Sequence, residues 1–489
     1  MDISKDFNIA IKHHQRGDLD NAEIFYNKIL KLEPNHLKTN FLLGTIFIQR
    51  KDFFSAKKIF LKVILINPNH FYAYNYLGII YRELKIFKKA KKYFDKVISL
   101  NKDYADGYYN LGLLFKDVED YKNAKKYYQK TIKVNPNHIN VYNNLGLIFS
   151  IFGKNEEAIN LFKKAIEVNP KNALAYNNIG NRYKEIGNYK KSIEAYNKAI
   201  EINQNIQQVY ENLGNVFRIK KNFKKAIEYF EKSNSENSKA QLLECIYFYH
   251  GLKKYREKLE IYTEKDFLNR RVATISAYVS ATKPLKNIYP FCKNPLEYFY
   301  KTNIENDLAN KNKFKKDLLD YLEKIDTIWE PSSKTTRKGF QTTGNLFKKD
   351  KFEIKSLIKI VEKTIILYKK KFSNSKDLII KKWPNKSSLN AWYVKLIHQG
   401  YQNSHIHPDG WISGVFYLKV PKLTNGQGGS IKLTLDGYDY PANKRLLSLV
   451  HSPKDFDLIL FPSSLFHRTI PFKSNETRHV VAFDLIPLI

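Results

Sequence analysis

The sequence predicts a multidomain protein: an all-α superhelix of repeated helix pairs, followed by an α+β domain with a double-stranded β-helix, or jelly-roll, core. Three observations lead to this fold class. A period of 34 residues runs through the first half of the chain, short segments after residue 388 have the composition of strands, and two histidines stand two positions apart beside one of them. With 489 residues, the chain is long enough for more than one hydrophobic core.

Three columns of residues carry the 34-residue period. A small residue is followed twelve positions later by a second small residue, and four positions after that by an aromatic ring. The small residues let two antiparallel helices pack closely, the ring fills the space between them, and a proline that follows in four units ends the second helix. The columns are Ala10, Gly44, Gly78, Gly112, Gly146, Gly180 and Gly214; Ala22, Ala56, Ala90, Ala124, Ala158, Ser192 and Ala226; and Tyr26, Phe60, Phe94, Tyr128, Phe162, Tyr196 and Phe230.

The period resembles that of tetratricopeptide repeats, in seven units over residues 3–238. We therefore assign residues 1–238 to the repeats and residues 239–265 to helices that cap them. The resemblance implies a superhelix with a concave groove that binds a protein or a peptide.

An asparagine recurs two positions before the glycine in four consecutive units. An amide side chain both donates and accepts hydrogen bonds, so such a column could bind an extended peptide backbone. The column resembles the asparagine ladder in the repeat domain of O-linked N-acetylglucosamine transferase. The alternative is that these are ordinary solvated positions of a repeat surface. The candidate groove residues are Asn110, Asn144, Asn178 and Asn212.

Residues 266–387 lose the period and are expected to support the C-terminal domain with helices. Apolar residues recur every three to four positions over 312–325 and 353–373, which predicts two helices. The polar segment between them, 328–343, is expected to be a loop.

Composition limits the partners and the compartment. The net charge of +35 comes from lysines spread over nearly every repeat, so we do not expect nucleic acid as the partner. The sequence has only two cysteines, no apolar run long enough to cross a membrane and no apolar N-terminal segment. We therefore expect a cytoplasmic protein that does not span a membrane.

The last part of the chain, 388–489, is expected to form the jelly roll. Strand-like segments are separated by Gly, Pro and Asn, which favour turns. The predicted strands cover residues 389–397, 412–420, 430–435, 456–461 and 479–486.

Histidines stand where such a domain could hold a metal. Residues two apart in a strand face the same side, so His405 and His407 can converge, as can His407 and Asp409. His467 follows about 60 residues later, and Arg478 comes shortly after it. A near pair of ligands, a distant histidine and a later arginine are the layout of a non-haem iron site.

The segments 400–418 and 457–472, together with Arg478, resemble bacterial 2-oxoglutarate- and Fe(II)-dependent oxygenases of the type fused to tetratricopeptide repeats. The resemblance covers roughly residues 265–489. It implies Fe(II), 2-oxoglutarate and O2, with Arg478 binding the distal carboxylate of 2-oxoglutarate through paired hydrogen bonds. Tyr393 and Tyr417 are candidates for the wall of that pocket.

The third metal ligand stays open. Most such oxygenases read His-x-Asp or His-x-Glu at the first site, whereas here the motif reads His405-x-His407 and the carboxylate follows at Asp409. His405 and His467 match the motif as ligands, and Asp409 and His407 are rivals for the third place. Asp409 could instead form the turn between Pro408 and Gly410.

The expected function is a 2-oxoglutarate- and Fe(II)-dependent dioxygenase, a hydroxylase whose repeats recruit a protein or peptide substrate. One alternative is a non-catalytic repeat scaffold with a degenerate β-domain. Another is a sugar isomerase or epimerase of the same fold, in which histidine acts as a base.

Overall fold

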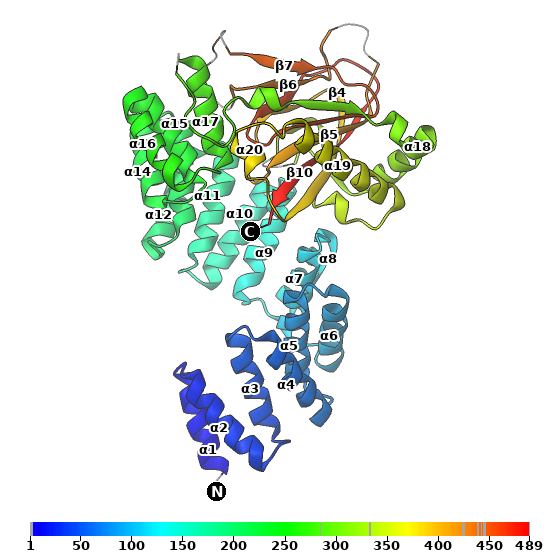
Figure 1. Cartoon of the computed structure of the whole chain (residues 1–489). Helices are drawn as coiled ribbons and strands as arrows, with labels where there is room; N and C mark the ends of the chain where they lie inside the picture. The colour runs from blue at the N-terminus through cyan, green and yellow to red at the C-terminus, as the bar shows by residue number, and fades with distance from the viewer. Residues whose placement is uncertain are drawn as a thin grey trace. The chain divides into compact units, whose positions relative to one another are not determined.

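The computed structural model describes residues 3–283, 285–331, 334–422, 426–437, 440–441, 443 and 446–488 (Figure 1). The chain separates into two compact units, Met1–Ile148 with Glu157–Lys171 and Phe149–Glu156 with Asn172–Ile489. None of the helices in the described part combines the length and the apolar run that crossing a bilayer would need.

The first unit is built from antiparallel helix pairs. The last pair, α9 and α10, is divided between the two units. The helices are α1 (Ile3–Gln15), α2 (Leu19–Leu32), α3 (Leu37–Gln49), α4 (Phe53–Ile66), α5 (Phe71–Glu83), α6 (Phe87–Leu100), α7 (Ala105–Asp117), α8 (Tyr121–Val134), α9 (Ile139–Ile151) and α10 (Asn155–Val168).

The repeat columns explain how each pair packs. A Cβ atom added to Gly112 would lie 2.4 Å from ring carbons of Tyr128, so only glycine lets the ring approach this closely. Several second helices begin after an Asp or Asn whose side chain accepts a hydrogen bond from a backbone N–H of the first turn, as Asp52 does from Ser55 at 3.0 Å.

The second unit continues the helix pairs and adds the sheet. The predicted capping helices are α15 and α16, and α17 follows them. The helices are α11 (Ala173–Glu185), α12 (Tyr189–Ile202), α13 (Gln207–Ile219), α14 (Phe223–Ser233), α15 (Ser238–His250), α16 (Leu252–Lys265), α17 (Arg270–Thr282), α18 (Lys311–Leu322), α19 (Phe352–Lys371) and α20 (Leu378–Lys381), with short 3-10 turns η1 (Pro295–Tyr298), η2 (Glu305–Asp307) and η3 (Leu346–Lys348).

One antiparallel sheet forms the β-domain. Its strands run in the order β1-β8-β5-β10-β4-β9-β6-β7, and β3 pairs with both β2 and β4. The strands are β1 (Tyr300–Asn303), β2 (Thr327–Trp329), β3 (Thr336–Thr342), β4 (Ser387–His405), β5 (Ile412–Lys419), β6 (Ile431–Thr434), β7 (Ser448–His451), β8 (Asp457–Pro462), β9 (Phe466–Thr469) and β10 (Arg478–Pro487).

The two faces of the sheet bury different clusters. Val394, Phe461 and Val480 belong to a cluster made only by the sheet and its loops, whereas Tyr393 and Val481, one position away, belong to the large cluster shared with the helices. Alternation along the strands produces this division. The predicted fold class, helical repeats followed by an α+β domain with a jelly-roll core, is confirmed.

Most elements expected after residue 300 are present, but the polar loop is not. The expectation of a loop over 328–343 was wrong, because most of this segment forms β2 and β3; Ser332 and Ser333 lie outside the described residues. Its polar residues pair through their backbone with β4, which sequence periodicity does not reveal.

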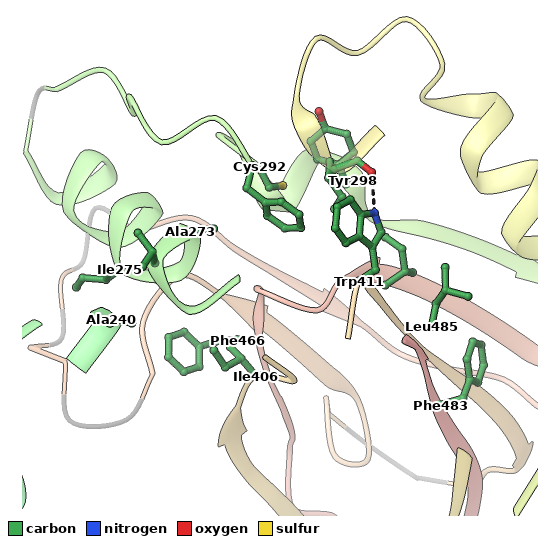
Figure 2. Packing of buried hydrophobic residues seen from close by; sticks show 14 of the residues in the cluster. Ala240, Ala273, Ile275, Cys292, Tyr298, Ile406, Trp411, Phe466, Phe483 and Leu485 are labelled. Carbon is green, nitrogen blue, oxygen red and sulfur yellow. Dashed lines mark hydrogen bonds between the residues drawn. The ribbon is translucent and has the colours of Figure 1, made fainter. Parts of the chain in front are cut away.

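Figure 2 shows part of the cluster between the helices and the sheet. Trp411 lies between Leu485 and the segment that carries Cys292 and Tyr298, and its indole N–H donates to the Ile379 carbonyl at 2.8 Å. Both cysteines of the chain are buried and free. This packing fixes the start of β5, and with it the segment that holds the candidate site.

Candidate metal centre

Two neighbouring strands bring the first two histidines together. His405 ends β4 and lies directly opposite His467 in β9, with a register shift between Gln402 and His405. Their ring centroids are 4.2 Å apart. His407 follows two residues after His405, and one ring nitrogen of each of the three histidines lies within 4.8 Å of the other two.

Backbone carbonyl groups orient two of these rings. Nδ1 of His405 lies 2.6 Å from the Asn403 carbonyl oxygen, and Nδ1 of His467 lies 3.2 Å from that of Leu465. Because a carbonyl oxygen can only accept, each Nδ1 carries the hydrogen. The lone pair of each ring is therefore on Nε2, the nitrogen available to a metal.

A carboxylate orients the third ring. Nδ1 of His407 donates to Oδ1 of Asp484 at 2.6 Å, and the Ser413 hydroxyl donates to the same oxygen at 2.6 Å. Asp484 lies on β10 and is 6 % exposed. The sequence interpretation missed this residue; its only signal is a carboxylate inside the apolar run 480–486.

Burial favours the neutral form of two of the three imidazoles, those of His405 and His467. Loss of solvent, with a smaller electrostatic effect of the neighbouring His407, lowers the pKa of His405 to about 3. Burial also lowers the pKa of His467 well below its usual value. Neutral imidazole is the form that binds a metal, so these rings need not lose a proton near neutral pH.

The structure does not bring Asp409 into the cluster. Asp409 is exposed and lies in a turn in which the Gly410 N–H donates to the His407 carbonyl oxygen at 3.0 Å. Arg270 holds this turn by donating from Nε to the Pro408 carbonyl oxygen at 2.8 Å. Of the four residues predicted to bind metal, only the three histidines come together.

Arg478 lines the same cavity as the three histidines. It is the first residue of β10, is 1 % exposed, and its guanidinium carbon lies 5.0 Å from the centroid of the Tyr417 ring. Its Nε and Nη1 atoms have no hydrogen-bond partner among the described residues. A buried cation without an anion is costly, and a ligand carboxylate would offset that cost.

Comparisons with known proteins agree with this arrangement. A family model described as "Putative 2OG-Fe(II) oxygenase" matches residues 390–484. Tetratricopeptide-repeat models match residues 7–36, 37–70, 71–104, 103–171, 161–194, 180–221 and 207–239. The chain is a fusion of tetratricopeptide repeats with a 2OG-Fe(II) oxygenase family domain. The resemblance found in the sequence is thereby confirmed.

Several solved structures are similar to part of this fusion protein. The crystal structure of MamA is 32% identical, with 34% of this chain and 96% of that chain covered and a TM-score of 0.31. YrrB, described as "a TPR protein with an unusual peptide-binding site", is 23% identical over 38% of this chain and 95% of that chain, with a TM-score of 0.31. A tetratricopeptide repeat protein from Parabacteroides merdae is 18% identical. The match covers 50% of this chain and 98% of that chain, with a TM-score of 0.41. No curated protein matches the chain.

The two tyrosines predicted to wall the oxygenase pocket lie in different places. Tyr417 packs against Arg478, as described above, whereas Tyr393 faces the other side of the sheet and its hydroxyl lies 2.7 Å from Nδ1 of His479. Trp392, one residue before Tyr393, lines the cavity instead, 5.2 Å from the His407 ring.

The cavity enclosed by the histidines and Arg478 is narrow. Its free volume of about 20 Å³ holds one water molecule, so a dicarboxylate can enter only if lining side chains such as Trp392 move. A larger cavity of about 380 Å³ lies next to it and shares Trp392, Gln402, His405 and His407 as lining residues.

The asparagine column of the repeats makes hydrogen bonds between neighbouring units. Nδ2 of Asn110 donates to Asn75 at 2.8 Å, and Nδ2 of Asn212 donates to Asn177 at 2.9 Å. Asn144 donates to the Tyr109 hydroxyl at 2.9 Å, and Asn178 is half-buried. Three of the four amides already bridge helices, and peptide binding by this column stays a prediction.

Proposed function

We propose that the C-terminal domain is a 2-oxoglutarate- and Fe(II)-dependent dioxygenase that hydroxylates a protein or peptide recruited by the repeats. His405, His407 and His467 would hold the iron, and Arg478 would bind the distal carboxylate of 2-oxoglutarate. The observation that supports this most is the proximity of the three imidazoles. Each has its Nδ1 hydrogen-bonded to an acceptor, which leaves Nε2 with the lone pair, and one ring nitrogen of each lies within 4.8 Å of the other two.

Iron, 2-oxoglutarate and O2, when bound, supply the oxidative decarboxylation of 2-oxoglutarate to succinate and CO2, coupled to hydroxylation of a substrate C–H bond. The residues of the chain position the reactants. Arg478 can donate to a carboxylate from its unpartnered nitrogens, alone or together with Nη2 on the same edge of the guanidinium, and it stays charged when buried. Trp392 and Phe461 line the cavity with apolar rings that exclude water.

His407 is the better candidate for the third ligand. Asp409 is exposed, whereas His407 belongs to the histidine cluster. Three imidazoles would leave the full charge of Fe(II) uncompensated in the first coordination shell. Asp484 supplies a negative charge one hydrogen bond away, through His407, and such partners strengthen ligation.

The alternative, a repeat scaffold with a degenerate β-domain, does not explain why Arg478 is buried without an anion. A domain without a co-substrate would bury this guanidinium at a cost, with two nitrogens unpartnered among the described residues. The isomerase alternative would need a histidine placed as a base. Burial holds the pKa of His405 and His467 far below neutrality, which weakens them as bases.

The decisive experiment measures iron binding and 2-oxoglutarate turnover by the purified full chain. We expect one equivalent of Fe(II) to bind anaerobically and succinate to form when O2 is admitted. His467→Ala should abolish both. His398→Ala, which removes an exposed histidine of the same sheet, should change neither. Absence of iron binding in the unaltered protein, or a His467→Ala variant that behaves like it, would refute the proposal.

A further inference from the structure

A third cavity lies within the second compact unit, beside Ile406. Its volume is about 270 Å³, and it is lined by residues of α11, α13, α15 and α17 together with Ile406. The helical side is strongly polar, with Lys184 from α11, Arg218 from α13, Gln241 from α15 and Arg271 from α17. We call it the helix cavity.

Ile406 connects the helix cavity to the metal centre. It stands between His405 and His407, so alternation turns its side chain away from the histidine cluster. Figure 2 shows Ile406 beside Phe466, on the side of the sheet where Ala240 and Ala273 of the helices lie. Ile406 also lines the 380 Å³ cavity that reaches the histidines, so the two cavities share one wall residue.

The charges of the helix cavity favour an anion. Its two carboxylates are engaged: Glu244 pairs with Arg218 at 3.4 Å and accepts from the Tyr440 hydroxyl at 2.6 Å, and Glu211 accepts from Ser235 at 2.9 Å. Lys184 and Arg271 form no ion pair within the described part of the chain. Three cations, Lys184, Arg218 and Arg271, thus face two carboxylates, and the cavity keeps a net positive charge.

Unpartnered polar atoms in the same cavity indicate a ligand with hydrogen-bonding groups. Gln241 is 6 % exposed, and its Oε1 has no hydrogen-bond partner among the described residues. Nε of Arg271 is likewise buried without a partner there. A buried amide oxygen needs a donor such as a peptide N–H, and a buried guanidinium N–H needs an acceptor such as a carboxylate.

We propose that the helix cavity binds an acidic side chain of a peptide, with Lys184 and Arg271 on its carboxylate and Gln241 on a backbone N–H. The adjoining part of the peptide crosses Ile406 toward His405 and His407. This last step rests on the proposed function, whereas binding of the peptide does not.

The test uses the full chain and two fluorescein-labelled nonapeptide mixtures, randomised except for a central Glu or a central Gln. Fluorescence anisotropy should show tighter binding of the Glu mixture by about tenfold, the gain expected from a hydrogen bond to a charged group. Lys184→Gln and Arg271→Gln should each remove this preference. Lys253→Gln, an exposed lysine on α16, should retain it, and thermal unfolding should show all three variants folded.

Equal binding of the two mixtures, or a preference that survives both Lys184→Gln and Arg271→Gln, would overturn the inference. The inference would also be overturned if a single-stranded oligonucleotide bound more strongly than the Glu mixture and Arg271→Gln weakened that binding, because the cavity would then bind phosphate groups. His467→Ala separates this inference from the proposed function. That variant should keep the preference for the Glu mixture while it loses Fe(II) binding. If the unaltered chain prefers the Glu mixture but does not bind Fe(II), only the proposed oxygenase function is refuted.

Discussion

Asp484 is expected to control metal affinity without touching the metal. Asp484→Asn keeps the size of the side chain but removes the charge that Nδ1 of His407 meets at 2.6 Å. The neutral amide also leaves the Ser413 hydroxyl with a weaker acceptor at the same oxygen. Loss of a carboxylate that orients a ligating histidine lowers metal affinity about 10- to 100-fold, or about 1.4–2.7 kcal/mol.

Anaerobic titration with Fe(II), followed by calorimetry, measures this effect directly. Asp457→Asn is the matched control, because Asp457 forms another His–Asp pair of the same domain, with His451 at 3.2 Å, outside the histidine cluster. The control should bind Fe(II) like the unaltered chain. Unchanged Fe(II) affinity in a folded Asp484→Asn variant would refute the assignment of His407 as a ligand oriented by Asp484.

Three further outcomes follow from the structure. Arg478→Lys keeps the charge but loses the paired hydrogen bonds, so the KM for 2-oxoglutarate should rise about tenfold or more, measured by succinate release; an unchanged KM would contradict the role of Arg478. Gly112→Ala places a methyl group against the buried Tyr128 ring and should lower the free energy of unfolding in urea by about 1–2 kcal/mol, since overpacking outweighs the gain in helix propensity. Burial, with a smaller effect of nearby Lys395, lowers the pKa of His479 to about 4. The unfolded chain therefore binds one more proton between pH 6.5 and 4, and stability should fall as the pH falls through that range, by up to about 1.4 kcal/mol per pH unit; His479→Gln should reduce that slope in urea titrations.

The repeats could be predicted because their packing is local in sequence. The glycine and the aromatic ring that meet in one unit are sixteen positions apart, as Gly78 and Phe94 are, and the contact recurs with every period. The same holds for α18 and α19, where an apolar stripe alone indicates a helix. The predicted starts of these helices, 312 and 353, fall within one residue of Lys311 and Phe352.

The sheet and the site could be predicted only in part, because strand pairing joins distant segments. His405 and His467 stood out as a motif, but nothing local ties Asp484 to His407, which lies 77 residues earlier. Only the pairing of β10 with β4 and β5 brings that carboxylate to the ring. Tyr393 was wrongly placed in the pocket for a different reason. Its neighbour Trp392 lines the cavity, whereas Tyr393 faces the other side of the sheet, so an error of one position along β4 exchanges the two.

The length of β4 links the two halves of the proposed site. This one strand pairs with Arg478 through Leu396 and with His467 through His405, so nine residues of continuous backbone set the spacing between guanidinium and imidazole. Deleting one residue between 397 and 402, where the pairing of β4 with β3 and β9 shifts register, would change that spacing and the direction in which His405 points. Under the proposed function, such a variant would keep binding of the peptide by the repeats and lose Fe(II) binding and turnover of 2-oxoglutarate.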